Sequence, residues 1–197
     1  MGKIFYLMGK SASGKDTIYK NLGERYGGRL KKVIMYTTRP IRKGEQDGEE
    51  YFFSTEDRVK NLKEEGKIIE LREYQTVHGP WKYFTVDDGQ IDLARDNYLI
   101  IGTLQSYVST KSYFGKDSLV PIYIEVEDGK RLIRAIEREM PEKEPKYAEI
   151  CRRFLADSED FSEENLEKAG ITRRFYNENI ETVAEEIAAY IDEFLEV

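Results

Sequence analysis

Short apolar runs alternate with segments of helical periodicity along most of the chain. Each run has the length of one buried strand, and the five runs are Ile4–Met8, Val33–Tyr36, Tyr98–Gly102, Pro121–Val126 and Thr172–Tyr176. The helices between and after them are expected to begin near Gly14, Asp88, Leu104, Asp128 and Ile180. Strands that alternate with helices form right-handed βαβ units. The pattern therefore predicts an α/β fold with a mostly parallel five-stranded sheet flanked by helices.

Two segments interrupt this alternation. Between residues 37 and 88 the chain has a polar loop, a short helix around Glu56–Glu65, and a hairpin around Gly79-Pro80 with strands Lys67–Val77 and Trp81–Val86. We expect residues 35–88 to form a subdomain inserted into a core of residues 1–34 and 89–197. The second segment, MPEKEPK at 140–146, holds two prolines and four charges between two helices. It is interpreted either as part of a lid over about residues 139–150 or as a plain surface loop.

Composition narrows the classes of partner. The 197 residues can bury one substantial core, and the formal net charge of −7 argues against a general nucleic-acid binder. No apolar stretch is long enough to cross a bilayer, and the start lacks the features of a signal peptide. Cys151 is the single cysteine, so no intrachain disulfide can form and a cytoplasmic location is expected. His78, the single histidine, is expected to be a turn residue beside Gly79-Pro80, and one histidine with one cysteine cannot build a structural zinc site.

A glycine-rich segment follows the first apolar run directly and precedes a helix. Residues 9–17 read GKSASGKDT, which places Gly9, Gly14 and Lys15 in the pattern Gly-x4-Gly-Lys. Unpaired backbone N–H groups at the start of the helix attract phosphate, and the lysine adds a mobile charge for the β and γ phosphates of a nucleotide. The sequence therefore predicts an ATP-binding phosphate loop in a fold of the P-loop NTPase type, with contacts from Gly9, Ser11, Ala12, Ser13, Gly14, Lys15, Asp16 and Thr17.

Asp16 stands where this loop usually carries serine or threonine, whose hydroxyl is offered to magnesium. A carboxylate could bind Mg²⁺ directly or through water, because hard cations prefer oxygen ligands. Asp16 is therefore the candidate metal ligand, and Mg²⁺ with ATP is the expected cofactor.

A basic cluster follows the second apolar run. Arg39 and Arg42 flank Pro40, which stiffens the backbone between two guanidinium groups suited to phosphate, and Tyr51 could add a hydroxyl donor. Taken alone, the segment is better interpreted as a solvated charged loop. However, it resembles the guanylate kinase family motif T-T-R-x-P-R-x-G-E-x-x-G-x-D-Y-x-F. The matching residues are Thr37, Thr38, Arg39, Arg42, Gly44, Glu45, Gly48, Tyr51 and Phe53, with Glu50 in place of the aspartate.

The resemblance extends over nearly the whole chain, although it thins after Tyr83, and it implies roles for individual residues. Those matching the grip on the acceptor phosphate are Arg39, Arg42, Tyr51 and Tyr83, and Glu70 matches a carboxylate that accepts hydrogen bonds from guanine. On the donor side the implied catalytic residues are Lys15, Arg134, Arg138 and Arg153, with Arg152 a competitor for the last position. Asn177 resembles an asparagine near the adenine of ATP.

Three departures from the family pattern fall in the acceptor site. Met35 replaces a serine that bonds the guanine carbonyl, while Ile101 and Thr103 replace an Asp-x-Asp pair linked to guanine and to magnesium. We therefore expect the phosphate grips to be retained and recognition of the base to be depleted.

The implied activity is transfer of the γ-phosphoryl group of ATP to a nucleoside monophosphate, with GMP the leading acceptor. Two alternatives stay open. One is a kinase of another phosphorylated acceptor, either a different nucleoside monophosphate or ribose 1,5-bisphosphate, whose kinases share Gly-Lys-Asp at the loop. The other is a guanylate-kinase-like binding module with weak or no catalysis. The expected partners are small nucleotides, without nucleic acid or membrane, and the sequence does not decide the oligomeric state.

Overall fold

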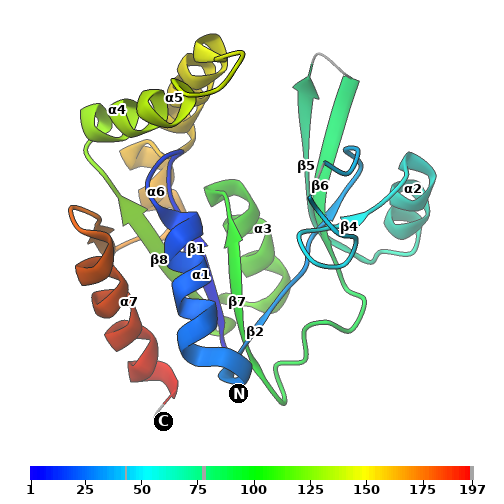
Figure 1. Cartoon of the computed structure of the whole chain (residues 1–197). Coiled ribbons are helices and arrows are strands. Elements are labelled where there is room, and N and C mark those ends of the chain that lie inside the picture. The colour runs from blue at the N-terminus through cyan, green and yellow to red at the C-terminus, as the bar shows by residue number, and fades with distance from the viewer. Residues whose placement is uncertain (43, 77–78, 196–197) are drawn as a thin grey trace.

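The chain folds into a parallel sheet with helices on both faces and a smaller second sheet beside it (Figure 1). This computed structural model describes residues 1–42, 44–76 and 79–195. Val77 and His78, for which a strand end and a turn role are predicted, lie outside the described residues, as does Lys43.

The parallel sheet has the strand order β2-β7-β1-β8-β9, and all four neighbouring pairs are parallel. Its strands are β1 (Ile4–Met8), β2 (Leu30–Lys32), β7 (Asn97–Gly102), β8 (Leu119–Glu125) and β9 (Arg174–Tyr176). The predicted five-stranded parallel sheet is thereby confirmed. Central β1 is buried along its whole length, which explains why it reads as an unbroken apolar run.

Helices cover both faces of this sheet. Phe5 and Leu7 of β1 pack with α1 (Lys15–Tyr26) and α7 (Ile180–Leu195) in one core cluster. Ile4, Tyr6 and Met8 point to the opposite face, where they pack with α3 (Leu104–Phe114) and α6 (Glu163–Ala169). Successive strand residues alternate between faces, so one strand contributes to both layers. The short 3₁₀ turns η1 (Gly27–Arg29) and η2 (Lys116–Ser118) lead into β2 and β8.

Two helices lie beyond the carboxyl end of the parallel sheet, α4 (Asp128–Glu139) and α5 (Tyr147–Asp160). Figure 1 shows them as a pair above α1 and the loop that follows β1. The proline-containing residues 140–146 connect them, so the predicted lid range spans this connection and the start of α5. No helix of the described residues is long and apolar enough to cross a membrane.

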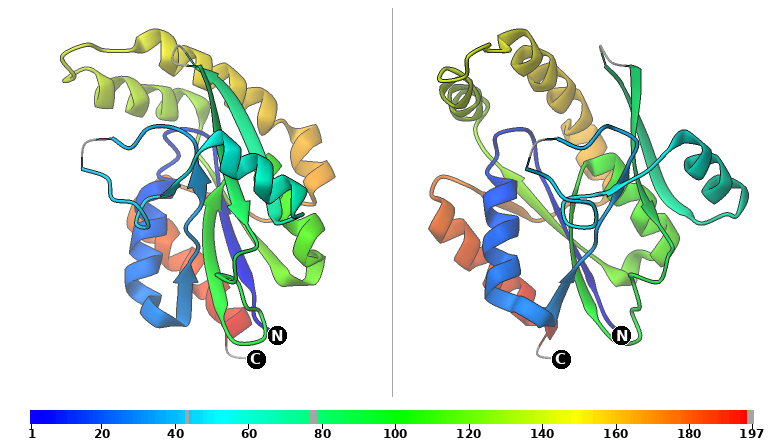
Figure 2. Two further views of the ribbon diagram at one scale, coloured as in Figure 1. Left: turned by 90° about the vertical axis from the view of Figure 1, so that its right-hand side faces the viewer. Right: turned by 45° about the vertical axis from the view of Figure 1, so that its right-hand side comes forward.

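The second sheet is mixed, with the order β4-β3-β6-β5. Its strands are β3 (Tyr36–Thr37), β4 (Phe52–Phe53), β5 (Ile68–Thr76) and β6 (Gly79–Val86), and α2 (Glu56–Glu64) packs on it through Val59. The short helix and the antiparallel hairpin are therefore confirmed within the described residues, but Gly79 and Pro80 lie in β6, paired with Thr76 and Gln75, and do not form the turn. As both views of Figure 2 show, β5 and β6 rise beside the parallel sheet, with α2 on their outer side.

Two predicted elements are wrong. Residues 33–36 are not a strand of the parallel sheet: that strand ends at Lys32, and Tyr36 already belongs to the second sheet. The apolar run reflects burial instead, because Val33 and Tyr36 pack into two different cores. No helix begins near Asp88: Gly89 takes a left-handed φ of 86°, and Gln90 bonds the backbone of Ile34, so the segment crosses between sheets as turns.

Candidate functional site

The loop after β1 has the geometry of a phosphate loop. β1 ends at Met8 and α1 begins at Lys15, so residues 9–14 connect a buried strand to the start of a helix. Gly14 caps the helix with φ 85°, and a Cβ there would lie 2.5 Å from Nδ2 of Asn177. Only glycine meets both demands without strain. The free N–H groups of the first turn of α1 therefore face the same end of the sheet as the loop.

Asn177 lies beneath this loop, where it supports the loop backbone. Its Nδ2 donates to the carbonyl of Ser13 at 2.8 Å, and the two side chains are 3% and 1% exposed. Arg134 in turn donates to the carbonyl of Asn177 at 3.3 Å. These contacts tie two predicted site residues to the shape of the loop, whereas the contact of Asn177 with adenine stays a prediction.

A buried arginine with partly exposed carboxylate partners, which the sequence did not reveal, joins α4 and α5 to the loop. Arg131 is 2% exposed, donates to Asp128 at 2.8 Å and lies 3.4 Å from the carboxylate of Asp157. Asp157 accepts the backbone N–H of Ser11 at 2.7 Å. The guanidinium also lies 4.2 Å from the ring centre of Phe154. No sequence motif singled out Arg131 or Asp157. The tertiary structure is what shows that these two residues hold the helix pair against the loop.

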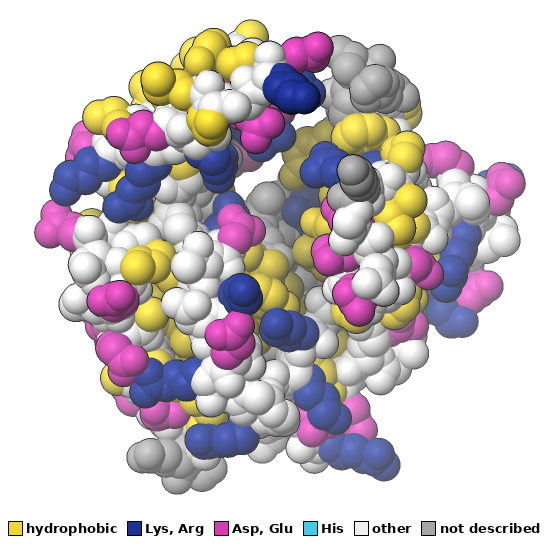
Figure 3. Space-filling model, in the orientation of Figure 1, with side chains coloured by type: hydrophobic (Ala, Val, Ile, Leu, Met, Phe, Trp, Pro, Cys, Tyr) yellow, Lys and Arg dark blue, Asp and Glu magenta, His cyan; other side chains and the backbone are white. Residues whose placement is uncertain are grey.

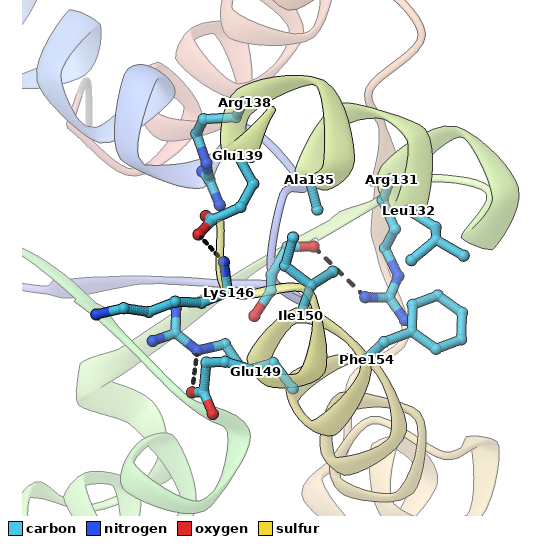
Figure 4. Close-up of a pocket in the computed structure, with 11 residues that line it drawn as sticks. Arg131, Leu132, Ala135, Arg138, Glu139, Lys146, Glu149, Ile150 and Phe154 are labelled. Carbon is cyan, nitrogen blue, oxygen red and sulfur yellow. Dashed lines mark hydrogen bonds and ion pairs between the residues drawn. The ribbon is translucent and has the colours of Figure 1, made fainter. Parts of the chain in front are cut away.

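A pocket lies between α4 and α5 and reaches the phosphate loop (Figure 4). Three predicted donor-side residues line it, namely Ser11, Arg138 and Arg153. Glu149 lies among them and accepts from Arg152 at 2.7 Å and from Arg153 at 2.8 Å, which lowers the pKa of Glu149 to about 2. Arg153 lines this pocket while Arg152 does not, among the residues described, which favours Arg153 as the pocket-facing arginine.

A second pocket opens between the two sheets, where the surface in Figure 3 is hollowed. It brings together loop residues and acceptor-side residues that are far apart in the sequence. Its lining consists of Lys15, Asp16, Met35, Tyr51, Arg72, Tyr74, Tyr83, Ile101, Gly102 and Thr103. All three positions that depart from the family pattern therefore face the same space as the two tyrosines.

Arg39 lies next to Tyr51, and its guanidinium is paired with the carboxylate of Glu45. It is 3% exposed and contacts both carboxylate oxygens of Glu45, at 2.5 and 2.7 Å. Its guanidinium carbon also lies 5.1 Å from the ring centre of Tyr51. These bonds to Arg39 hold the pKa of Glu45 at about 2. Arg42 is exposed, and its backbone N–H donates to Glu45 at 2.8 Å. The structure thus brings Arg39 and the backbone of Arg42 together at Glu45, whereas neither arginine is among the described residues that line the pocket with the two tyrosines.

Glu70 is not a free carboxylate in the pocket. Its side chain is 1% exposed and accepts from Nε and Nη2 of Arg72 at 3.0 and 3.2 Å, and from the hydroxyl of Thr85 at 3.0 Å. Arg72, to which no sequence motif assigns a role, lines the pocket instead. The alternating strand pattern could have found it, because residues two apart on a strand share a face. The predicted contact of Glu70 with guanine stays untested.

Asp16 can take part in metal binding only together with other ligands. Its side chain is 84% exposed and lies 3.7 Å from Nζ of Lys15, at the rim of the pocket. The described residues contain no cluster of three or more metal-binding side chains. Magnesium bound to a nucleotide needs just one or two carboxylates beside the phosphates and water, so a single aspartate at this place fits the ion.

Comparison with known proteins finds similarity to guanylate kinases. Residues 1–82 match the family model described as guanylate kinase. The guanylate kinase of Thermotoga maritima is 31% identical over 124 residues, which are 63% of this chain and 49% of that protein. The guanylate kinase of Oceanobacillus iheyensis is 38% identical over 73 residues, or 37% of this chain and 35% of that protein. The sequence matches thus span about half of the first relative and about a third of the second.

The fold match is broader. The crystal structure of guanylate kinase from Anaplasma phagocytophilum superposes with a TM-score of 0.69 at 20% identity, covering 98% of this chain and 85% of that one. Sheet order and phosphate loop define an α/β protein of the P-loop NTPase type. Within that class, residues 1–82 are similar to the guanylate kinase family, and the fold of nearly the whole chain is similar to that of a guanylate kinase.

Proposed function

We propose that the chain transfers the γ-phosphoryl group of ATP to the phosphate of a nucleoside monophosphate, with GMP the leading acceptor and ADP and GDP the products. The single observation that carries this proposal is the shared pocket. Lys15 of the phosphate loop and the tyrosine pair Tyr51 and Tyr83 line one space between the two sheets. A donor phosphate held at the loop and an acceptor phosphate held at the tyrosines would then face each other in line, which is most of what phosphoryl transfer requires.

The residues divide into three groups by their task. The loop backbone and Lys15 would hold the β and γ phosphates of ATP. Arg138 and Arg153, which line the pocket above Ser11, would stabilise charge on the moving group. Arg39, Arg42, Tyr51 and Tyr83 would fix the acceptor phosphate, whose oxygen is already anionic, so no protein general base is needed.

Asp16 would hold Mg²⁺ beside the nucleotide phosphates, and the ion would neutralise charge on their oxygens. The other contributions to the reaction would come from the protein itself. The α4–α5 pair above the loop would exclude water from the transferring group and so limit hydrolysis of ATP.

The test is acceptor-dependent release of ADP from ATP and Mg²⁺, measured with GMP in a coupled assay. Replacing Lys15→Ala removes the mobile cation at the phosphates, so we expect a loss of at least about a thousandfold in kcat. Lys20→Ala, which removes an exposed lysine of the same helix, is the matched control and keeps full activity. Near-normal turnover in Lys15→Ala would overturn the donor assignment. Binding of ATP without any acceptor-dependent turnover would identify a binding module instead.

A further inference from the structure

The base-facing part of the pocket presents a cation where a carboxylate is expected. The hairpin register pairs Arg72 on β5 with Tyr83 on β6, so the two side chains are neighbours on one face of the sheet. Tyr83 also lies 5.6 Å from Tyr51 between ring centres. The guanidinium of Arg72 therefore lines the pocket directly beside the tyrosines that are assigned to the acceptor phosphate.

The carboxylate behind Arg72 is already committed. A carboxylate offers about four acceptor positions, and three of those on Glu70 are taken by Arg72 and Thr85. At 1% exposure, the side chain of Glu70 offers almost no surface to a ligand. Glu70 therefore holds Arg72 in place.

The guanidinium of Arg72 has N–H groups left that can donate hydrogen bonds to a ligand. Nε and Nη2 bond Glu70, and Nη2 also lies 3.7 Å from the sulfur of Met35. Nη1 donates no hydrogen bond to another of the described residues, and it is not a buried atom without a partner. Burial favours a lower pKa for Arg72, but the charge of Glu70 and the hydroxyl of Tyr6 outweigh it and raise that pKa, so the group stays cationic.

We propose that Arg72 is the specificity-determining residue of the acceptor site and donates to an oxygen of the acceptor, so that this chain recognises a carbonyl or anionic oxygen and does not read an amino group. For a purine, that oxygen is the 6-oxo group. The 2-amino group of guanine then contributes little, and nucleotides with and without it are bound alike. This role of Arg72 rests on the proposed function only for the position of the acceptor phosphate.

Equilibrium binding of acceptors by titration calorimetry tests this without requiring turnover. We expect GMP and IMP, which differ by the 2-amino group, to bind within about threefold of each other, because a site that reads a group rejects its absence by far larger factors. AMP, which puts an amino group where the oxygen belongs, binds at least about tenfold more weakly. Ribose 1,5-bisphosphate is included to separate a second phosphate from a base carbonyl as the source of the oxygen.

The variant that tests the residue is Arg72→Gln combined with Glu70→Gln, because removing Arg72 alone leaves a buried unpaired carboxylate. We expect it to bind GMP and IMP about 10- to 100-fold more weakly, the range of a hydrogen bond to a charged group, and to lose the preference over AMP. Arg72→Lys, which keeps the charge beside Glu70 but not the planar fork, shows a smaller loss in the same direction. Lys60→Gln, which removes an exposed cation on α2, leaves all affinities unchanged.

The outcomes separate this proposal from the proposed function. Binding of GMP about a hundredfold tighter than IMP, or unchanged acceptor affinity in the double variant, overturns the role of Arg72. Arg72-dependent binding of ribose 1,5-bisphosphate ahead of every nucleotide supports it, with a phosphate as the oxygen source. Arg72-dependent binding of 6-oxopurine nucleotides without phosphoryl transfer also supports it, and overturns the kinase activity alone.

Discussion

Ala12 is the residue at which the phosphate loop departs from relaxed backbone geometry. It has φ 62°, and among the described residues it is the one non-glycine with a positive φ. A Cβ in the left-handed region clashes with the following carbonyl and costs about 1–2 kcal/mol. The loop keeps its shape because Ser11 and Ser13 on either side are held by Asp157 and Asn177.

Replacing Ala12→Gly is therefore expected to stabilise the fold. We expect a gain of about 0.5–1 kcal/mol in the free energy of unfolding, the cost of the Cβ less the extra freedom of glycine in the unfolded chain. Urea denaturation measures it. Ala189→Gly, at an exposed position inside α7, is the opposite control and should lose about 1 kcal/mol. A loss of stability in Ala12→Gly would show that the loop is not strained there.

The sequence motifs indicated which residues lie together in a pocket, but not which other side chains those residues contact. Lys15, Tyr51 and Tyr83 were placed in the site by motif, and they do line one pocket. The Glu70–Arg72 pair was missed because a motif assigns a role to one residue, while the ion pair depends on a neighbour two positions away being buried with it. The contact of Asp157 with Ser11 joins residues 146 positions apart and leaves no local trace in the sequence.

Among the elements, α3 shows that a residue departing from the family pattern, Thr103, can also stabilise the fold. Thr103 is its N-cap: the hydroxyl accepts from the N–H of Ser106, and the hydroxyl of Ser106 accepts from the N–H of Thr103, at 3.2 and 2.9 Å. Two unpaired N–H groups are satisfied by this reciprocal box. Thr103 thus both lines the pocket and fixes where α3 begins.

Thr103→Ala is expected to cost about 1 kcal/mol of unfolding free energy, because it leaves the first turn of α3 without its cap. Thr103→Asp should restore most of this stability, since aspartate caps as well as threonine, and should also tighten Mg²⁺ binding in the presence of ATP by adding a second carboxylate near Asp16. Thermal melts and a metal titration read out the two effects. Equal stability of the alanine and threonine proteins would remove the capping role.

On the scale of the whole molecule, the two sheets are joined by two crossings of the chain and by contacts of α3. The chain passes between them after β2 and again before β7, and β5 packs against α3. The hydroxyl of Tyr113 on α3 also donates to Asp87, just after β6, at 2.8 Å. Such an arrangement can close over ligands by a hinge at the two crossings.

We expect joint binding of a non-hydrolysable ATP analogue and GMP to reduce the radius of gyration, because phosphates at the loop and at the tyrosines would draw both sheets toward the shared pocket. Small-angle X-ray scattering measures the change. The analogue alone should give a smaller effect, and Lys15→Ala should show almost none. A radius that does not change with both ligands bound would mean that the pocket is already closed.

The sequence alone determined the parallel sheet, the phosphate loop and the family resemblance, because these follow from local patterns: apolar runs of strand length, helical stripes and glycines at fixed spacing. Tertiary structure decided the rest. It showed that β2 ends at Lys32, that residues 88–96 are turns, and that Arg72 rather than Glu70 faces the pocket. Each of these depends on which groups from distant segments are buried together, and burial is a property of the packed chain that no single segment encodes.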